Sequence, residues 1–541
     1  MKNGIKVFAF LLLGGLMFWV IQDVLTPDHN KTVNSHYILS GFQKLEPDSV
    51  DVLLVGPSHI VDDVYSMELY RDHQIRAYSL ATGGQPFNVS YYMIKYAFET
   101  QSPRIVILDA AHIPHPNSRS NSEGYWKFVI DNMPMGLTKI ELGAAYGAEY
   151  SSEAEGVLSA VFPIIDYHSR WNELSEEDFV PRSTGYYYSM GSFVMSQISG
   201  TNWTLKEINR WATEASSINQ SEMIYIKDGA EGKTEITTPN LEQKLSEEAI
   251  EILKKIKDMC DQNGAELVLV NIPSRVYLLP GNRAWTTDVS RQVGNLAEQL
   301  GLTFIDLMYD VDTGVDFSTD TIDGGVHLNV RGAEKVSHFL SGWLDENFVF
   351  DHAANDIWDA QLEKFDKVLE VALLQSETDF SEYLSRLIRN ADKWDILISA
   401  REEFTNALNE DDFEKFRSLG LTLISRAKWV DSYLSVVKSG QAEYEAMSQR
   451  RINYKTELEY NGKTVSMISS GANSISYASI KIGEQEYAPN KNGLNIVVID
   501  RETGLVIDSC SFNTRHEEAA ASRTISIYYY LRDYESAVCF E

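Results

Sequence analysis

Short aliphatic runs alternate with helical patterns along the first two thirds of the chain. The pattern predicts strands at residues 50–56 (VDVLLVG), 75–80, 104–110 (RIVILDA), 265–272 and 303–307. It predicts helices at 61–71, 87–100, 241–263 and 331–346, and a further helix that follows the strand at 265–272 and ends at residue 300. Uninterrupted aliphatic strands, each followed by a helix, are typical of a buried parallel sheet. We therefore expect an α/β domain over residues 45–348.

This domain is interrupted by a long insertion at residues 111–240. The insertion carries few strand signals and is rich in Tyr and Trp, as in YHSRW (167–171) and GYYYSMGSF (185–193). Aromatic side chains near the carboxyl ends of a sheet suit sugar binding, although such side chains more often serve in ordinary packing.

The hydrophobic pattern changes beyond residue 352. Apolar residues recur at three-four spacing over 358–373, 380–400 and 413–437, which predicts a helical region over 352–450. From residue 455 to 541 short alternating segments separated by Gly, Asn and Pro predict a small β-rich domain.

The first 25 residues form a membrane-targeting segment. Lys2 and Lys6 precede an uncharged run from Val7 to Ile21, and the polar stretch TPDHNKTVNS follows in place of a small-x-small cleavage site. The run is short for a full span, yet we favour an uncleaved anchor within residues 1–29 over a cleaved signal peptide. Because positive charge stays cytoplasmic, residues 30–541 are expected outside the cell membrane.

Charge and cysteine content exclude several classes. With 78 acidic and 47 basic residues the net charge is −31, so the chain would repel nucleic acid and we expect no nucleic-acid partner. Three cysteines without CxxC spacing are too few for a disulfide framework, and they predict no zinc site.

Two segments carry residues suited to acyl chemistry. Ser58 follows the first strand in VGPSH, where a strand turns into a helix and a serine hydroxyl projects at the sheet's carboxyl edge. Near the last strand, DTIDGGVHLNVRG places Asp323 four residues before His327. A carboxylate can fix the imidazole tautomer while the other ring nitrogen faces the serine.

In these motifs, and in ATGGQP at 81–86, the sequence resembles the SGNH (GDSL-like) hydrolase superfamily. Within that superfamily it resembles the membrane-anchored branch, which includes the alginate acetylation proteins and the protein of teichoic-acid D-alanylation. The resemblance covers about 48–348 and implies a doubly wound, flavodoxin-like parallel sheet. It implies Ser58 as nucleophile and first oxyanion donor, His327 and Asp323 as its partners, and Gly83 or Gly84 as a further backbone donor. We expect no cofactor. The resemblance implies a multi-span membrane acyltransferase as a possible partner.

The chain departs from that family at two points. The usual Asp-x-x-His has one extra residue here, so Asp320 is the alternative to Asp323. The asparagine expected after the third strand is missing, since that strand continues as LDAAHIP.

Other polar residues have two interpretations each. His59 is either a base or metal ligand or a packed histidine at the start of a helix, and HIPHP (112–116) is either a His-x-x-His metal pair or a loop. His168 and Arg170 are candidate substrate-binding residues for a carboxylate or phosphate, or they are structural pairs.

The C-terminal segment resembles the interleukin-like EMT inducer (ILEI) domain. The matching positions lie in GLNIVVIDRETGLVIDSCSFNT and are Gly493, Asn495, Asp500, Gly504, Asp508 and Phe512, with Asn513 in place of the usual Asp. The resemblance implies glycan or partner binding, or a capping domain without a ligand. Cys510 and Cys539 could pair if the domain is oxidised.

Two classes of function follow from these observations. The first is an SGNH-type O-acyltransferase or acylesterase that acts on a cell-surface polysaccharide. The second is a non-catalytic scaffold or glycan-binding protein with the same fold, because a fold alone does not establish activity.

Overall fold

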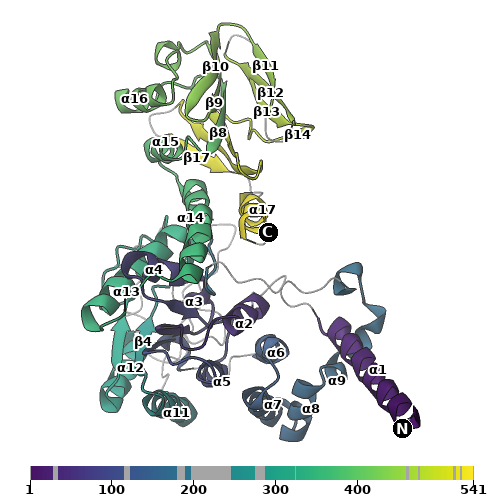
Figure 1. Cartoon of the computed structure of the whole chain (residues 1–541). Coiled ribbons are helices and arrows are strands. Elements are labelled where there is room, and N and C mark those ends of the chain that lie inside the picture. The colour runs from purple at the N-terminus through teal and green to yellow at the C-terminus, as the bar shows by residue number, and fades with distance from the viewer. Residues whose placement is uncertain are drawn as a thin grey trace, which may run out of the picture. The chain divides into compact units, whose positions relative to one another are not determined.

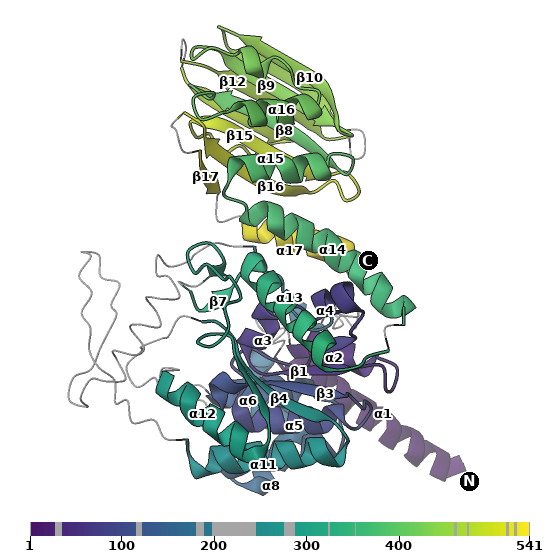
Figure 2. The same ribbon diagram turned by 90° about the vertical axis from the view of Figure 1, so that its left-hand side faces the viewer.

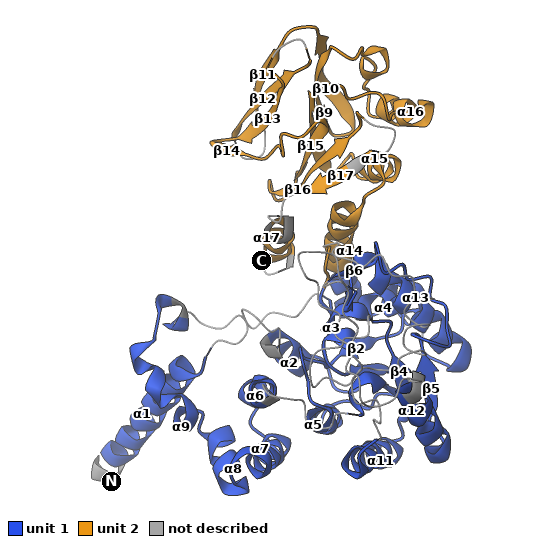
Figure 3. Ribbon diagram, turned by 180° about the vertical axis from the view of Figure 1, so that it is seen from behind, with its two compact units in different colours: residues 1–193, 198–362 blue, residues 194–197, 363–541 orange. Residues whose placement is uncertain are grey.

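The computed structural model divides the chain into two compact units, which are coloured separately in Figure 3. Unit 1 comprises residues 1–193 and 198–362, and unit 2 comprises residues 194–197 and 363–541. The structure describes residues 2–27, 35–114, 122–179, 189–196, 245–274, 287–322, 325–351, 353–458, 462–472, 475–515, 519–523 and 527–539.

Unit 1 contains a five-stranded parallel sheet with the strand order β2-β1-β3-β4-β5. Its strands are β1 (Val52–Val55), β2 (Ala77–Ser79), β3 (Ile105–Asp109), β4 (Glu266–Asn271) and β5 (Thr303–Asp306). Val52 pairs with Ala77 on one side and Ile105 on the other. Nearly every residue of the three central strands is buried, so the predicted α/β architecture is confirmed.

Helices lie on both sides of this sheet. They are α2 (Ser35–Gln43), α3 (Ser58–Asp63), α4 (Ser66–His73), α5 (Phe87–Ala97), the 3₁₀ turn η2 (Ala110–His112), α11 (Glu247–Gln262), α12 (Thr287–Leu300) and α13 (Val330–Asn347). Figures 1 and 2 show α3, α4 and α13 on one side and α5 and α11 on the other. A short antiparallel pair, β6 (Thr321–Ile322) and β7 (His327–Leu328), precedes α13.

The described part of the insertion is mostly helical, whereas residues 189–196 form neither helix nor strand. It contains α6 (Ser122–Asn132), α7 (Leu137–Tyr150), α8 (Glu153–Val161), α9 (Ile164–Tyr167), η3 (His168–Asn172) and η4 (Glu176–Phe179). The N-terminal helix α1 (Lys2–Leu25) contacts α9, η3 and η4. By length and composition, residues Ile5–Leu25 of α1 could cross a membrane or serve as a signal sequence.

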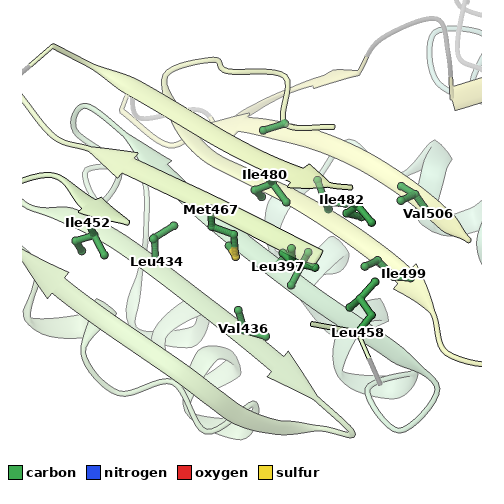
Figure 4. Close-up of a cluster of buried hydrophobic side chains, with 13 residues drawn as sticks. Leu397, Leu434, Val436, Ile452, Leu458, Met467, Ile480, Ile482, Ile499 and Val506 are labelled. Carbon is green, nitrogen blue, oxygen red and sulfur yellow. The ribbon is translucent and has the colours of Figure 1, made fainter. Parts of the chain in front are cut away.

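Unit 2 is built on a ten-stranded, mostly antiparallel sheet. Its strands are β8 (Trp394–Arg401), β9 (Ser432–Lys438), β10 (Gln441–Ser448), β11 (Ile452–Glu457), β12 (Thr464–Ser470), β13 (Tyr477–Ile482), β14 (Gln485–Glu486), β15 (Gly493–Asp500), β16 (Val506–Asn513) and β17 (Ala520–Arg523). Figure 4 shows part of the core, where aliphatic side chains such as Leu397, Leu434 and Ile480 gather from different strands.

The helices of unit 2 are fewer than the sequence pattern predicts. They are α15 (Phe380–Arg389), α16 (Glu410–Ser418), η5 (Ile424–Arg426) and α17 (Ile527–Cys539), with α14 (Asp356–Ser376) crossing the boundary between the units. The expectation of a helical region throughout 352–450 is wrong, because β8, β9 and β10 fall within it.

The error has a physical cause in β8. This strand pairs with β15 on one side and β9 on the other, and all of its residues except the last are buried. A central strand buried on both faces forms a continuous apolar run, which hydrophobic periodicity alone does not separate from a buried helix.

Candidate active site

Ser58 is the first residue of α3, directly after the turn that ends β1. Pro57 precedes it in an extended conformation and provides no side-chain cap. A Cβ at Gly56 would come within 2.7 Å of Ile60 Cγ1 and 2.8 Å of Asp109 Cβ, so only glycine permits the close approach of this turn to the end of β3. The turn therefore holds the serine at the carboxyl edge of the sheet.

The structure brings His327 to this serine. The Nε2 atom of His327 lies 2.8 Å from Ser58 Oγ, a hydrogen-bond distance, although 269 positions separate the two residues in sequence. His327 is on β7, where it pairs with Ile322 of β6. The serine hydroxyl and the imidazole are therefore at the distance that a nucleophile and its general base need.

A buried carboxylate joins the two elements that carry this pair. Asp63 ends α3, and its Oδ1 accepts a hydrogen bond of 2.7 Å from the backbone N–H of Leu328, the residue after His327. Asp63 is fully buried. It fixes β7 against the helix that begins with Ser58, and the sequence interpretation missed it because nothing local to Asp63 marks a partner 265 residues away.

The structure describes one of the two carboxylates that are candidates for orienting His327. Asp323 lies outside the described residues. Asp320 is buried, and its carboxylate accepts from Lys335 Nζ at 2.5 Å and the Asp316 N–H at 2.8 Å, with Arg331 Nε at 3.4 Å. These contacts turn Asp320 toward α13 and give it a structural role.

Backbone donors are free near the serine. Gly83 and Gly84 lie in the loop between β2 and α5, and Gly84 has a left-handed φ of +64° with the Tyr125 ring where a Cβ would be. In the described part of the chain, the N–H groups of Ser58, Gly83 and Gly84 donate to no protein acceptor. The Thr82 N–H, next to Gly83, donates to the Gly56 carbonyl at 3.3 Å, so this loop lies beside the turn before Ser58.

A second group of titratable side chains adjoins His327. The His59 ring centroid lies 5.4 Å from that of His327 and 6.5 Å from that of His112. His59 Nδ1 is 3.6 Å from Asp109 Oδ2, which is too long for a hydrogen bond, and neither atom has a hydrogen-bond partner among the described residues. Burial lowers the pKa of His112, which favours a neutral imidazole.

The candidate substrate-binding residues of the insertion make structural contacts. His168 Nδ1 lies 2.9 Å from the Ile165 carbonyl. Arg170 donates from Nη1 to the Leu25 carbonyl at 2.7 Å and from Nη2 to Asp178 at 2.9 Å. Neither has a described contact with Ser58 or His327, and the structure favours the structural interpretation of both residues.

The described residues give no support to a metal site at the HIPHP motif. His115 of the HIPHP motif lies outside the described residues. Within the described ranges, no group of three or more His, Cys, Asp or Glu is arranged to hold a metal ion.

In unit 2, three ILEI-like positions have internal partners. Asn495 donates to the Lys491 carbonyl at 2.8 Å, Asp500 accepts from the Thr503 N–H in the turn after β15, and Asp508 accepts from the Tyr383 hydroxyl at 2.8 Å. These side chains hold the β15–β16 hairpin in place. Cys510 is a buried free thiol, and the side chain of Cys539, its expected partner, lies outside the described residues.

Comparison of the chain with protein-family models and with curated proteins finds no match.

Replacing Asp63 tests the link between α3 and β7. We expect Asp63→Ala to lower the free energy of unfolding by about 1–3 kcal/mol, because it leaves the buried Leu328 N–H without an acceptor. Asp63→Asn retains an oxygen at that place and should lose less. Urea unfolding measures both, with Asp312→Ala as a control, since that carboxylate bonds only an exposed turn N–H. Equal stability of Asp63→Ala and wild type would contradict the assigned role.

His112 should make the fold sensitive to acid. Its pKa in the folded state lies below the 6.5 of a free imidazole, so below that pH the unfolded chain binds more protons and stability falls. We expect the thermal midpoint to drop between pH 7 and pH 5, and to drop less in His112→Gln. Calorimetry across that range measures the difference, and identical pH profiles would show that burial of His112 has no such effect.

Proposed function

We propose that this protein is an SGNH-type serine acyltransferase or acylesterase that transfers an acyl group, in our view acetyl, to or from a cell-surface polysaccharide. The observation that carries the proposal is the 2.8 Å contact between Ser58 Oγ and His327 Nε2 at the carboxyl edge of a parallel sheet. A serine and a histidine so distant in sequence have no local reason to meet.

The arrangement of unit 1 supports an SGNH fold. The strand order β2-β1-β3-β4-β5 is that of flavodoxin-like doubly wound sheets. In such sheets ligands bind at the carboxyl ends of the strands, where β1 leads to Ser58. The nucleophile directly follows the first strand and the histidine precedes the last helix, as in the family that the sequence resembles.

The first half of the proposed reaction forms an acyl-serine. Ser58 Oγ attacks the carbonyl carbon of an ester while its proton passes to His327 Nε2. The carbonyl oxygen becomes an oxyanion, and the free N–H groups of Ser58 and of Gly83 or Gly84 are suited to stabilise it. The C–O bond of the ester then breaks, and the leaving alcohol takes the proton from His327.

The second half releases the acyl group. Water or a sugar hydroxyl gives its proton to His327 and attacks the acyl carbon, and the bond to Ser58 Oγ breaks as the serine regains a proton. With water the product is a free acid, and with a sugar hydroxyl it is an acylated glycan. The same side chains serve both outcomes.

We infer that α1 anchors the protein in the cell membrane, with the bulk of the chain outside. Arg170 donates to the Leu25 carbonyl at the end of α1, so this helix has specific contacts with the rest of unit 1 that a removable signal would not need. An anchored enzyme facing outward would act on a surface polysaccharide and could receive its acyl group from a multi-span membrane acyltransferase.

Turnover of a chromogenic acetyl ester by the full-length protein tests the catalytic proposal. We expect wild type to release the chromophore and Ser58→Ala to lose about 10³-fold or more in kcat/KM, because no other group supplies the nucleophile. Ser425→Ala, which removes an exposed hydroxyl of unit 2, serves as the matched control and should keep wild-type rates. Unchanged turnover in Ser58→Ala would refute the proposal, and a wild type without turnover would favour the non-catalytic scaffold.

The carboxylate that orients His327 is tested separately. We expect Asp323→Asn to lose around 10⁴-fold in turnover, because an amide fixes the wrong imidazole tautomer. Asp320→Asn should lose thermal stability through its contact with Lys335 while its turnover falls less than about tenfold. A folded but inactive Asp320→Asn beside an active Asp323→Asn would reverse the assignment.

A further inference from the structure

Exposed apolar side chains concentrate in one part of unit 1. Outside α1, eight of the eleven large hydrophobic residues that are exposed in the described ranges lie between residues 135 and 179. We call these eight the apolar platform: Met135, Leu137, Ile140, Leu158, Phe162, Ile165, Trp171 and Phe179. Scattered exposed hydrophobics are ordinary, but these eight lie on or beside helices that contact one another or α1, which makes the segment a candidate interaction surface.

The platform is attached to α1. The Phe162 ring packs edge-on against Phe18, with ring centroids 6.1 Å apart, and Arg170, next to Trp171, donates to the Leu25 carbonyl. Figure 1 shows α9, which carries Ile165, beside α1. The part of the platform from Phe162 to Phe179 therefore lies against the apolar helix within unit 1.

The position of Phe18 along α1 gives the depth of this contact. Asp23 is the first charged residue after the apolar run, and Phe18 lies five residues before it. At 1.5 Å per residue this places Phe18 about 7.5 Å inside the charged end of the helix. Interfacial helices bury their apolar faces by about 5–10 Å in a membrane, which is the depth that Phe162 would have beside Phe18.

The charges of the platform segment indicate what kind of surface it would meet. Residues 135–179 contain Lys139 and Arg170 as their only Lys or Arg, and Lys139 is buried while Arg170 is paired with Asp178. The segment carries nine acidic residues. Anionic headgroups would therefore repel this segment, and apolar burial would have to supply its binding to a zwitterionic surface.

We propose that the apolar platform lies in the outer surface of the lipid bilayer around α1, with its side chains at the boundary between headgroups and acyl chains. This rests on the proposed anchoring by α1 and not on the acyl chemistry. Unit 1 would then be held against the membrane by two attachments, the spanning helix and the platform, and would have a fixed orientation toward it.

Fluorescence quenching in nanodiscs of zwitterionic phosphatidylcholine tests this proposal on the full chain. A bimane label is placed by Trp171→Cys, a site that is 72% exposed, and in a matched control by Ile475→Cys, a 91% exposed site of unit 2. Both variants carry Cys539→Ser, since Cys260 and Cys510 are buried. Intact mass first establishes that α1 is retained, which separates a failure of anchoring from a failure of the platform.

We expect a lipid-attached nitroxide to quench the label at position 171 several-fold more than aqueous iodide does, and iodide to dominate at position 475. Equal access of iodide to both positions would overturn the proposal. Protection of position 171 from both quenchers would overturn it as well, because it would show a protein surface, such as a second copy of the chain, on the platform.

Discussion

The contact between α3 and β7 is the constraint on which the candidate site depends. Its hydrogen bonds include one between Ser58 Oγ and His327 Nε2 at 2.8 Å and one from the Leu328 N–H to Asp63 at 2.7 Å. The first joins the proposed nucleophile to its base, and the second fixes the backbone beside them. Because the Asp63 carboxylate is buried, an unsatisfied partner would be costly, and the two elements are held in one register.

The surrounding structure maintains that register from both sides. On the sheet side, Gly56 allows the turn before Ser58 to lie against Asp109 at the end of β3. On the helix side, Asn329 caps α13 by accepting from the Arg331 N–H, and its own N–H donates to the Asp320 carbonyl. The carboxylate of Asp320 binds Lys335 one turn further along α13. His327 therefore lies on a short segment that is hydrogen-bonded to α3 through Asp63 and leads directly into the capped start of α13.

Local chemistry made part of this site predictable from sequence. Ser58 follows an aliphatic strand at a Gly-Pro turn, and His327 lies in a Gly-rich segment before a capped helix, so residue type and spacing alone indicated both. Asp63 and the contact of Arg170 with Leu25 gave no such signal, because each depends on a partner more than a hundred residues away. The strands of unit 1 were recognisable from their aliphatic runs, whereas β8 was mistaken for helix because both of its faces are buried.

Covalent labelling of the full-length protein with a serine-reactive fluorophosphonate, followed by peptide mass spectrometry, tests the central claim most directly. If His327 activates Ser58, the adduct forms on Ser58 in wild type and is lost or strongly slowed in His327→Ala, while thermal melting shows that the variant is folded. An adduct on another serine, or labelling of Ser58 at the same rate without His327, would contradict the account.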